Sequence, residues 1–227
     1  MSVLQMIPSL EEDWIKKFDP QKRLLTGKTY LMAKRAMDLV LVLTTLPLWL
    51  PLNLAIALII RLTSPGAPVV FRQLRTGKGG RRFNMYKFRT MVPNAEELKS
   101  QYKHLNELQW PDFKITNDPR ITSIGGFLRK TSLDEMPQLF NVLIGDMSLV
   151  GPRPTSFGAE TYKLWHTERL DVPPGLTGLW QIIGRAQLEF DDRLRLDIAY
   201  IERRSLWLDV NILARTVLAV FSQRGAH

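Results

Sequence analysis

The sequence contains no cysteine and only three histidines among its 227 residues. The missing thiols exclude disulfides, thiolate nucleophiles and sulfur-ligated zinc, and they permit a reducing cytoplasmic setting. The histidines, His104, His166 and His227, do not show the spacing of metal ligands. The first fourteen residues lack a basic region followed by an apolar run, so we expect no cleavable signal peptide.

The length and the composition suit one domain of ordinary size. Hydrophobic residues make up 45% of the chain, which is enough for a core and argues against disorder throughout. The formal net charge is +9 and the pI is about 9.9. Such a charge indicates anionic partners, which are nucleic acid, anionic lipid headgroups or phosphorylated small molecules. Charge alone does not choose among them.

Charged residues are absent from Leu39 to Ile60, a run of 22 residues. As a helix this run would be roughly 33 Å long, enough to cross a bilayer. Pro47 and Pro51 interrupt it, and each would cost about 3 kcal/mol inside a straight helix, so we expect a break. Both flanks are basic, so the positive-inside rule gives no clear asymmetry. We therefore predict a re-entrant hairpin with both ends on the cytoplasmic face; a buried core helix and a kinked full span are the alternatives.

A β-hairpin is predicted after the turn Ser64-Pro65-Gly66. Two short segments rich in β-branched and aromatic residues, Val69–Leu74 and Phe83–Phe88, are joined by a glycine-rich loop. The Gly-Lys-Gly-Gly sequence of this loop lacks the spacing of a phosphate-binding loop, and no helix start follows it. No acid occurs between Leu62 and Ala95. A solvated basic face is the ordinary explanation, but the position after the apolar run would place this hairpin among lipid phosphates.

A short helix is predicted at positions 136–144, where apolar side chains recur at the helical spacing and a glycine follows. Its start can be placed in two ways. Ser132 with Glu135 fits a capping box, whereas Pro137 loses no hydrogen bond only if it lies in the first turn. An N-cap at Asp134 makes Pro137 the third helical residue, and we favour this register.

The favoured register predicts chemistry at Asp134 and Glu135. A carboxylate at a helix N-terminus near Arg129 and Lys130 is held ionised by the helix dipole and the cations, and the same end attracts phosphate. An ionised aspartate can attack phosphorus, and an adjoining glutamate can hold a magnesium ion. Taken alone, such a pair is more often only a helix cap.

Two clusters rich in proline and glycine favour the active site over the cap. Arg153 stands between Pro152 and Pro154 after a glycine, which restricts the backbone and suits a guanidinium aimed at a phosphate. The second cluster, Pro173 to Gly178, precedes Arg185.

From about Lys34 to Ala226 the chain resembles the bacterial sugar transferase family, the monotopic polyprenyl-phosphate phosphoglycosyl transferases. The resemblance is carried by several motifs in order: Lys34-Arg35 with Asp38, Tyr86-Lys87-Phe88-Arg89-Thr90-Met91, Leu133-Asp134-Glu135, Gln138-Leu139-Phe140-Asn141, Gly145-Asp146-Met147-Ser148, Gly151-Pro152-Arg153-Pro154 and Pro174-Gly175-Leu176-Thr177-Gly178.

The resemblance implies an α/β, mostly helical fold of the family's small form, with a short β-hairpin. Residues 1–33 would be an N-terminal tail, residues 34–62 a re-entrant membrane helix-break-helix, and residues 63–227 the cytosolic catalytic domain. Pro51 matches the proline at which the family's membrane helix breaks, and Leu50 takes the place of the serine that often precedes it. The break is therefore expected at Leu50 and Pro51.

The resemblance also implies a magnesium-dependent, ping-pong reaction in which a sugar 1-phosphate moves from a UDP-sugar to polyprenyl phosphate, in bacteria undecaprenyl phosphate, with release of UMP. Asp134 would attack the β-phosphate and hold the sugar phosphate covalently, and Glu135, beside Asp134, would ligate Mg²⁺. The expected phosphate-binding residues are Lys87, Arg129, Arg153 and Arg185. Asp197 and Asp209 also match acidic positions of the family, but structural salt bridges explain them equally well.

The implied partners are the UDP-sugar, the polyprenyl phosphate and the phospholipid membrane, at the cytoplasmic face of the bacterial inner membrane. The step would be the first membrane step in assembly of an exopolysaccharide, capsule, O-antigen or glycoprotein glycan. No nucleic acid is expected, and a homodimer is left open. Two other classes compete: a nucleic-acid-binding membrane protein that uses the basic, aromatic hairpin, and a membrane-tethered scaffold whose arginines hold anionic lipid.

Overall fold

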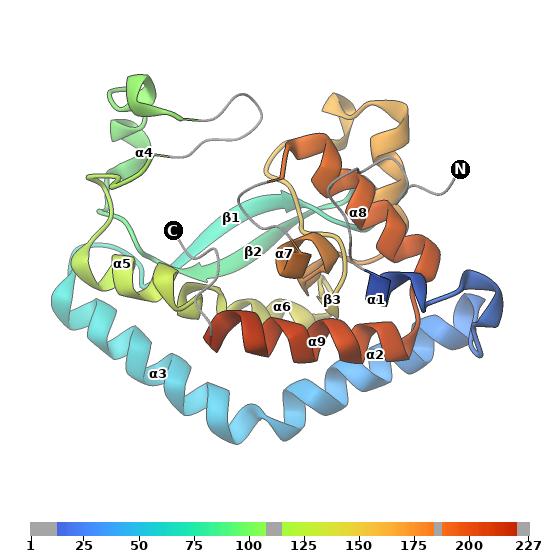
Figure 1. Ribbon diagram of the computed structural model, residues 1–227. Coiled ribbons are helices and arrows are strands. Elements are labelled where there is room, and N and C mark those ends of the chain that lie inside the picture. The colour runs from blue at the N-terminus through green and yellow to red at the C-terminus, as the bar shows by residue number, and fades with distance from the viewer. Residues whose placement is uncertain (1–12, 108–114, 184–187, 222–227) are drawn as a thin grey trace.

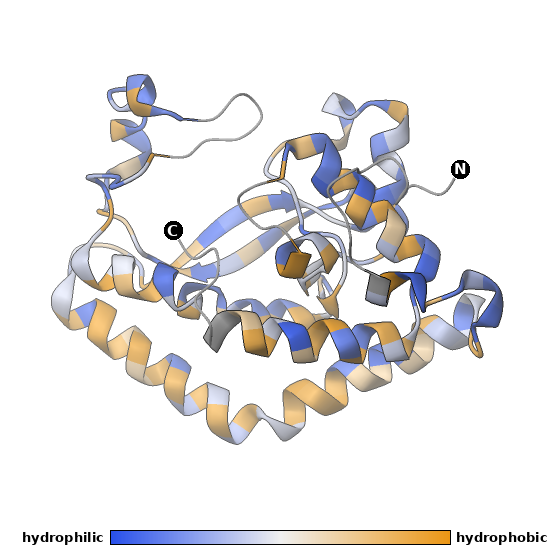
Figure 2. Ribbon diagram, in the orientation of Figure 1, coloured by the Kyte–Doolittle hydropathy of each residue, from blue (hydrophilic) through white to orange (hydrophobic). Residues whose placement is uncertain are grey.

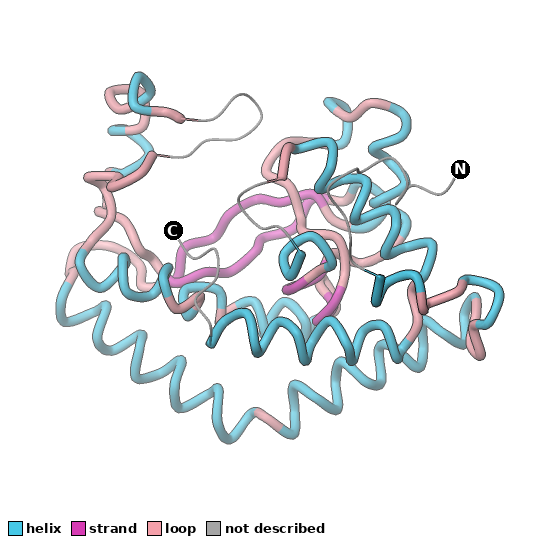
Figure 3. Tube along the Cα trace, viewed as in Figure 1, coloured by secondary structure: helices cyan, strands magenta, loops and turns pink. Residues whose placement is uncertain are grey.

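The computed structural model describes residues 13–107, 115–183 and 188–221. The described residues form a mostly helical fold with two small sheets, which confirms the predicted helical character and the short β-hairpin (Figure 3). The helices are α1 Asp13–Lys16, α2 Gly27–Thr44, α3 Leu46–Thr63, α4 Ala95–Leu98, α5 Ser123–Lys130, α6 Gln138–Ile144, α7 Leu179–Ile183, α8 Phe190–Arg203 and α9 Leu206–Phe221. The strands are β1 Val70–Thr76, β2 Arg82–Phe88, β3 Ser148–Val150 and β4 Gly175–Thr177.

Helices α2 and α3 meet in a V, and both arms of the V rise toward the rest of the fold (Figure 1). Within the described part of the chain, α3 is the one helix long and apolar enough to cross a membrane. Only 22% of it is buried, and its residues are largely hydrophobic (Figure 2). A helix of a soluble core would be mostly buried, so the core-helix alternative does not fit this exposure.

The break between the two arms lies at Thr45, so the predicted break at Leu50 and Pro51 is wrong in position. In a continuous helix the ring of Pro47 would clash with the carbonyl of residue 43, and the helix therefore ends before this proline. Pro47 instead occupies the first turn of α3, where its missing N–H costs little. Pro51 lies inside α3, and the helix continues through it.

Side chains near the break donate to carbonyls in the last turn of α2. The Thr45 hydroxyl donates to the Leu41 carbonyl at 2.6 Å, and the indole N–H of Trp49 donates to the Val42 carbonyl at 2.9 Å. Backbone carbonyls cannot remain unpaired in hydrocarbon, so these bonds suit a break placed in a membrane. The Trp49 ring also packs edge-on against Phe140 of α6, with ring centroids 5.1 Å apart.

We expect Trp49→Phe to destabilise the protein by about 1–2 kcal/mol, because the Val42 carbonyl loses its closer donor and keeps the Thr45 hydroxyl at 3.3 Å, while an aromatic ring stays against Phe140. Thermal unfolding in detergent would show this as a lower midpoint, by about 2–4 °C for each kcal/mol. Trp207→Phe is the matched control, because the Trp207 side chain is 69% exposed on α9. Equal midpoints for the two variants would contradict the role given to Trp49.

Charged residues that precede the apolar run fasten α2 to α9, α6 and β3. The ammonium of Lys34 lies 2.8 Å from the Asp209 carboxylate of α9. Arg35 donates to two carbonyls at the C-terminal end of α6. Asp38 accepts from the Ser148 hydroxyl of β3 at 2.7 Å. Helices α2, α6 and α9 and strand β3 are therefore held in one arrangement.

The hydrophobic core lies between α6, α8, α9 and β3. Its fully buried side chains include Val142, Val150, Leu196, Leu208 and Ile212. The core thereby fixes α6, which follows the predicted catalytic acids in the sequence, and β3, which precedes Arg153.

The β-hairpin is confirmed, with β1 antiparallel to β2 and Arg75 opposite Phe83. The hairpin docks on α6 through Asn141, which is fully buried. The Asn141 amide donates to the Asn84 carbonyl at 2.8 Å and accepts from the Tyr86 N–H at 3.0 Å. These bonds set the end of β2 against the turn that precedes α6.

The parallel pair of β3 and β4 was not predicted from the sequence. It joins the two proline- and glycine-rich clusters: the Gly151 N–H donates to the Thr177 carbonyl, and the Gly175 N–H donates to the Pro152 carbonyl, both at 2.9 Å. The chains approach so closely that a Cβ atom on Gly175 would lie 2.1 Å from the Gly151 nitrogen. The glycines of these motifs are therefore required by packing.

Candidate active site

The Asp134–Glu135 pair lies in a 3₁₀ turn, Leu133–Glu135, between α5 and α6. Ser132 enters this turn in the left-handed region, with φ 59°, and makes no side-chain cap. The N-cap of α6 is Pro137, so neither the predicted N-cap at Asp134 nor the capping box is correct. The 3₁₀ bond from the Met136 N–H to the Leu133 carbonyl explains the difference, because it closes a separate turn before the helix begins.

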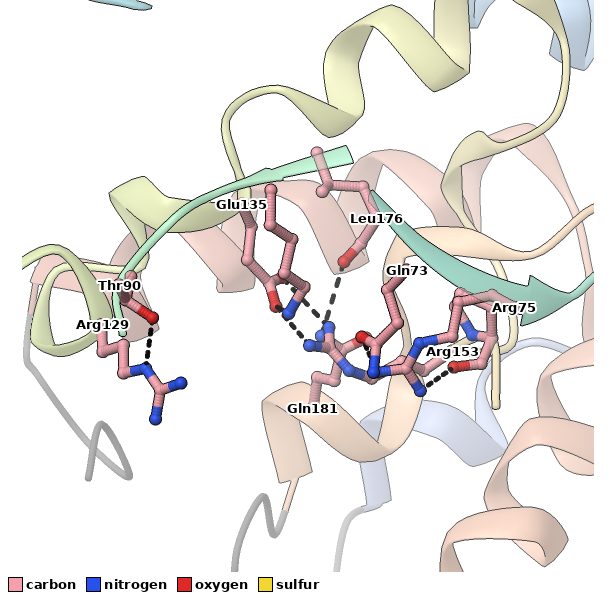
Figure 4. Close-up of polar contacts among 10 residues, drawn as sticks. Gln73, Arg75, Thr90, Arg129, Glu135, Arg153, Leu176 and Gln181 are labelled. Atoms are coloured by element: carbon pink, nitrogen blue, oxygen red, sulfur yellow. Dashed lines mark hydrogen bonds and ion pairs between the residues drawn. The ribbon is translucent and has the colours of Figure 1, made fainter. Parts of the chain in front are cut away.

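Two basic side chains hold the Glu135 carboxylate. The Lys87 ammonium lies 2.7 Å from Oε1, and the Arg153 guanidinium donates to both oxygens, at 3.1 Å to Oε2 and also to Oε1 (Figure 4). Burial alone would raise the pKa of Glu135, but Arg153 and Lys87 outweigh it and hold this pKa well below its usual range. Glu135 is therefore ionised in this arrangement. The structure thus brings together the predicted residues Lys87, Glu135 and Arg153.

Asp134 is buried beside them, with 9% of its surface exposed. Burial raises the pKa of its carboxyl, and the neighbouring Glu135 adds to the increase. The cations Lys87, Arg129 and Arg153 act in the opposite direction but do not cancel it. Desolvation therefore outweighs the nearby cations in its effect on this pKa, and the ionised state of Asp134 stays a prediction.

Arg129 approaches the acids from α5. Its Nε donates to the Thr90 hydroxyl at 2.8 Å, and its charge acts on Asp134. Figure 4 shows Arg129 on the side of Glu135 opposite to Arg153. Arg185, the fourth predicted phosphate-binding residue, lies outside the described residues.

Arg153 is positioned by Arg169, which itself pairs with Asp197. The Arg169 guanidinium donates to the backbone carbonyl of Arg153 and lies 2.6 Å from the Asp197 carboxylate of α8. Burial raises the pKa of Asp197 to about 7, against the pull of Arg169. Asp197 and Asp209 each belong to a buried ion pair, so both have the structural role that the sequence left open.

We expect Asp197→Ala to cost roughly 3–5 kcal/mol of stability, because it leaves the Arg169 guanidinium buried without its counter-charge. Denaturant unfolding measures this cost. Asp192→Ala is a matched control on the same helix, since Asp192 pairs with Arg195 at a partly exposed position, where such a pair contributes about 1 kcal/mol or less. Similar costs for the two variants would contradict this role of Asp197.

Asp134 and Glu135 fit a magnesium site in which the protein supplies only two carboxylates. Among the described residues, no group of three or more histidine or acidic side chains gathers to hold a metal ion. Mg²⁺ is often bound by only one or two carboxylates together with water and substrate phosphates, a donor set that Asp134 and Glu135 can supply. Both oxygens of Glu135 already accept hydrogen bonds from Lys87 and Arg153, so a metal on Glu135 would have to displace one of them.

Comparison with known proteins identifies the family of this chain. The family model described as bacterial sugar transferase matches residues 29–223. The chain belongs to this family. It is 45% identical over 174 residues to the galactosyl transferase CpsE of Streptococcus agalactiae serotype III, which is 76% of this chain and 39% of that protein. Over 199 residues it is 43% identical to the undecaprenyl-phosphate galactose phosphotransferase of Salmonella typhimurium, which is 86% of this chain and 41% of that protein.

A third relative matches this chain over most of the relative's own length. It is the exopolysaccharide production protein ExoY of Rhizobium meliloti, with 38% identity over 201 residues, 86% of this chain and 88% of that protein. The chain spans about two-fifths of the length of the first two relatives. The resemblance found in the sequence is thus confirmed at the level of the family.

Two further side chains lie beside the site and were not among the predicted residues. Arg75 of β1 donates to the Gln73 side-chain oxygen at 2.6 Å and to the Pro154 carbonyl at 3.2 Å. Burial, followed by the charge of Arg153, lowers the pKa of Arg75 to about 10. The alternation of side chains along the strands could have indicated that these residues lie at the site, because Gln73 and Arg75 share a face of the hairpin with Lys87.

Proposed function

We propose that this member of the bacterial sugar transferase family transfers a sugar 1-phosphate from a UDP-sugar to polyprenyl phosphate and releases UMP. The observation that carries the proposal is the buried Asp134, placed beside Glu135 and within the charge fields of Lys87, Arg129 and Arg153. A single buried carboxylate among cations suits attack on a phosphate whose own charge the cations neutralise. The names of the relatives support the lipid carrier and the transferred sugar phosphate.

The proposed reaction has two displacements at one phosphorus atom. An oxygen of Asp134 forms a bond to the β-phosphorus, and the bond from that phosphorus to the bridging oxygen breaks, so that UMP leaves with the electron pair. An oxygen of the lipid phosphate then forms a bond to the same phosphorus, and the bond to Asp134 breaks, which restores the carboxylate. Lys87 and Arg153 bind the oxygens of the transferred phosphate. Bound Mg²⁺ would neutralise further charge on these oxygens.

The proposed place is the cytoplasmic face of the bacterial inner membrane, with α2 and α3 as a re-entrant hairpin. The exposed apolar surface of α3 and the V formed with α2 support this topology. Both outer ends of the V meet the catalytic elements, through Lys34 at one end and through Ile60, packed against Leu128, at the other. A helix that crossed the membrane once would separate its two ends by the full bilayer.

Topology can be tested with single cysteines, because the sequence contains none. Cysteines at Lys22 and Glu96, which flank the hairpin and are exposed, should both be shielded from an impermeant thiol reagent outside intact cells. Both should react after the membrane is opened. Labelling of the Lys22→Cys protein alone in intact cells would show a full span and contradict the re-entrant hairpin.

The activity is tested with purified protein in detergent, polyprenyl phosphate, magnesium and a panel of UDP-sugars. We expect one UDP-sugar, or a small group, to give UMP and lipid-linked sugar phosphate in equal amounts. Removal of divalent metal with a chelator should stop the reaction, and added magnesium should restore it. Absence of both products with every UDP-sugar and every divalent metal would contradict the proposed function.

A further inference from the structure

Arg75 is a charged residue at the site that the proposed roles leave unused. Its side chain is partly buried, and the oxygens that accept from it, in Gln73 and Pro154, are both neutral. Its Nε is also buried and has no hydrogen-bond partner in the described part of the chain. Among the described residues, the guanidinium is therefore held in place without a hydrogen-bonded carboxylate.

The backbone around Arg75 is fastened to the segment that carries Arg153. The next residue, Thr76, donates its N–H to the Thr155 carbonyl at 3.0 Å and its hydroxyl to the Phe157 carbonyl at 2.7 Å. The Arg82 guanidinium donates to the Thr76 hydroxyl at 2.6 Å. Strand β1 and the segment that carries Arg153 are thus bonded together, and the side chains of Arg75 and Arg153 lie near each other (Figure 4).

Positive charge exceeds negative charge around Glu135. Lys87 and Arg153 pair with its carboxylate, and Arg75, whose hydrogen-bond acceptors are neutral, lies beside Arg153 (Figure 4). An excess of buried positive charge is stabilised by an anion, and a diphosphate carries the charge and the oxygens that guanidinium groups bind best.

The positions of Asp134 and Arg75 relative to each other indicate which phosphate Arg75 can reach. Asp134 lies in the charge fields of Lys87, Arg129 and Arg153, whereas the main charged neighbours of Arg75 are Arg153 and Glu135. Arg129 and Arg75 lie on opposite sides of Glu135 in Figure 4. In phosphoryl transfer the attacking and leaving oxygens lie roughly in line, so the leaving phosphate stands on the side of the transferred phosphorus away from Asp134.

We propose that Arg75 binds the phosphate that stands opposite Asp134 across the transferred phosphorus. This inference rests on the proposed function. In the first displacement that phosphate is the α-phosphate of the nucleotide, which leaves in UMP. In the second it is the attacking phosphate of the lipid, because attack in line on a phosphorus bound to Asp134 comes from the side that UMP has left. Arg75 therefore serves both substrates in turn.

Binding of UMP to the full-length protein tests the first half without requiring turnover. The wild type should bind UMP more tightly than uridine, and Arg75→Gln should weaken UMP binding by roughly 10- to 100-fold while leaving uridine binding unchanged. Arg75→Lys should retain part of the affinity. Arg81→Gln, on the same hairpin but exposed and paired with Asp146, should bind UMP as the wild type does. Unchanged UMP affinity in Arg75→Gln would overturn the proposal.

Initial rates test the second part of the proposal, which is that Arg75 also binds the attacking phosphate of the lipid. Arg75→Gln should raise the KM for the UDP-sugar and the KM for polyprenyl phosphate by similar factors. An increase for the UDP-sugar alone would overturn the shared role. Gln73→Leu provides a second variant, since it keeps Arg75 but removes its 2.6 Å acceptor, and it should weaken UMP binding less than Arg75→Gln. A wild type that binds UMP through Arg75 but transfers no sugar phosphate would contradict the proposed function and leave this binding site intact.

Discussion

Asp134→Asn is expected to abolish UMP release, with a loss in kcat on the order of 10⁴–10⁶, as when a covalent nucleophile is removed. The amide keeps the size of the side chain but has no charged oxygen to attack phosphorus. Burial raises the pKa of Asp134, so the fold favours a neutral group at this position. We therefore expect the inactive variant to be at least as stable as the wild type. UMP release and thermal unfolding measure the two effects.

Asp146→Asn is the matched control for this variant. Asp146 follows α6 and pairs with the exposed Arg81, away from the acidic pair. It should turn over UDP-sugar at the rate of the wild type. Turnover of Asp134→Asn within tenfold of this control would contradict the role of Asp134 as nucleophile.

Arg153→Met is expected to lower kcat/KM for the UDP-sugar by roughly 10³–10⁵, the range for an arginine that stabilises charge in phosphoryl transfer. Arg153 donates to both oxygens of Glu135, and its removal leaves Lys87 as the remaining cation on that carboxylate. The pKa of Glu135 should then rise, because burial is no longer outweighed to the same extent. Steady-state kinetics with the UDP-sugar measure the effect.

Arg195→Met serves as the control for loss of one arginine. Arg195 pairs with Asp192 on α8 and has no contact with the acidic pair, so kcat/KM should stay within twofold of the wild type. Arg153→Lys separates charge from geometry, since an ammonium cannot donate to two carboxylate oxygens as a guanidinium does. A kcat/KM of wild-type size in Arg153→Met would show that this arginine only supports the fold.

The elements with strong local signals could be predicted from the sequence. The hairpin was found from two short β-rich segments around a glycine-rich loop, and α6 from its apolar spacing and the glycine that follows it. Gly145 indeed ends α6 in the left-handed region, with φ 92°. Lys87, Glu135 and Arg153 come from three separated segments, yet they meet as the family resemblance implied.

The features that were missed depend on contacts between distant segments. The pairing of β3 with β4 involves strands of only three residues, which are too short for a pattern of alternation. The net shift in the pKa of Asp134 depends on burial, which only the packed fold determines. Arg75 was grouped with a basic surface although the alternation of β1 places it on the opposite face from the exposed Arg72.

The position of the break between α2 and α3 shows how two similar local signals compete. Pro47 and Pro51 each disfavour a continuous helix, and the family resemblance favoured Pro51. The chain breaks before Pro47, where the hydroxyl of Thr45 donates to the Leu41 carbonyl and the indole of Trp49 donates to the Val42 carbonyl. The bond from Trp49 joins the two arms, so its effect appears only once the two helices are placed together.

A covalent intermediate on Asp134 tests the central claim most directly. Purified protein and magnesium would be incubated with the reactive UDP-sugar in the absence of polyprenyl phosphate, and UMP and the mass of the protein would be measured. The expected result is one equivalent of UMP and a mass increase of one sugar phosphate, located on the peptide that contains Asp134. Later addition of polyprenyl phosphate should remove this mass. Release of UMP only when the lipid is present, with no change in protein mass, would contradict the covalent mechanism.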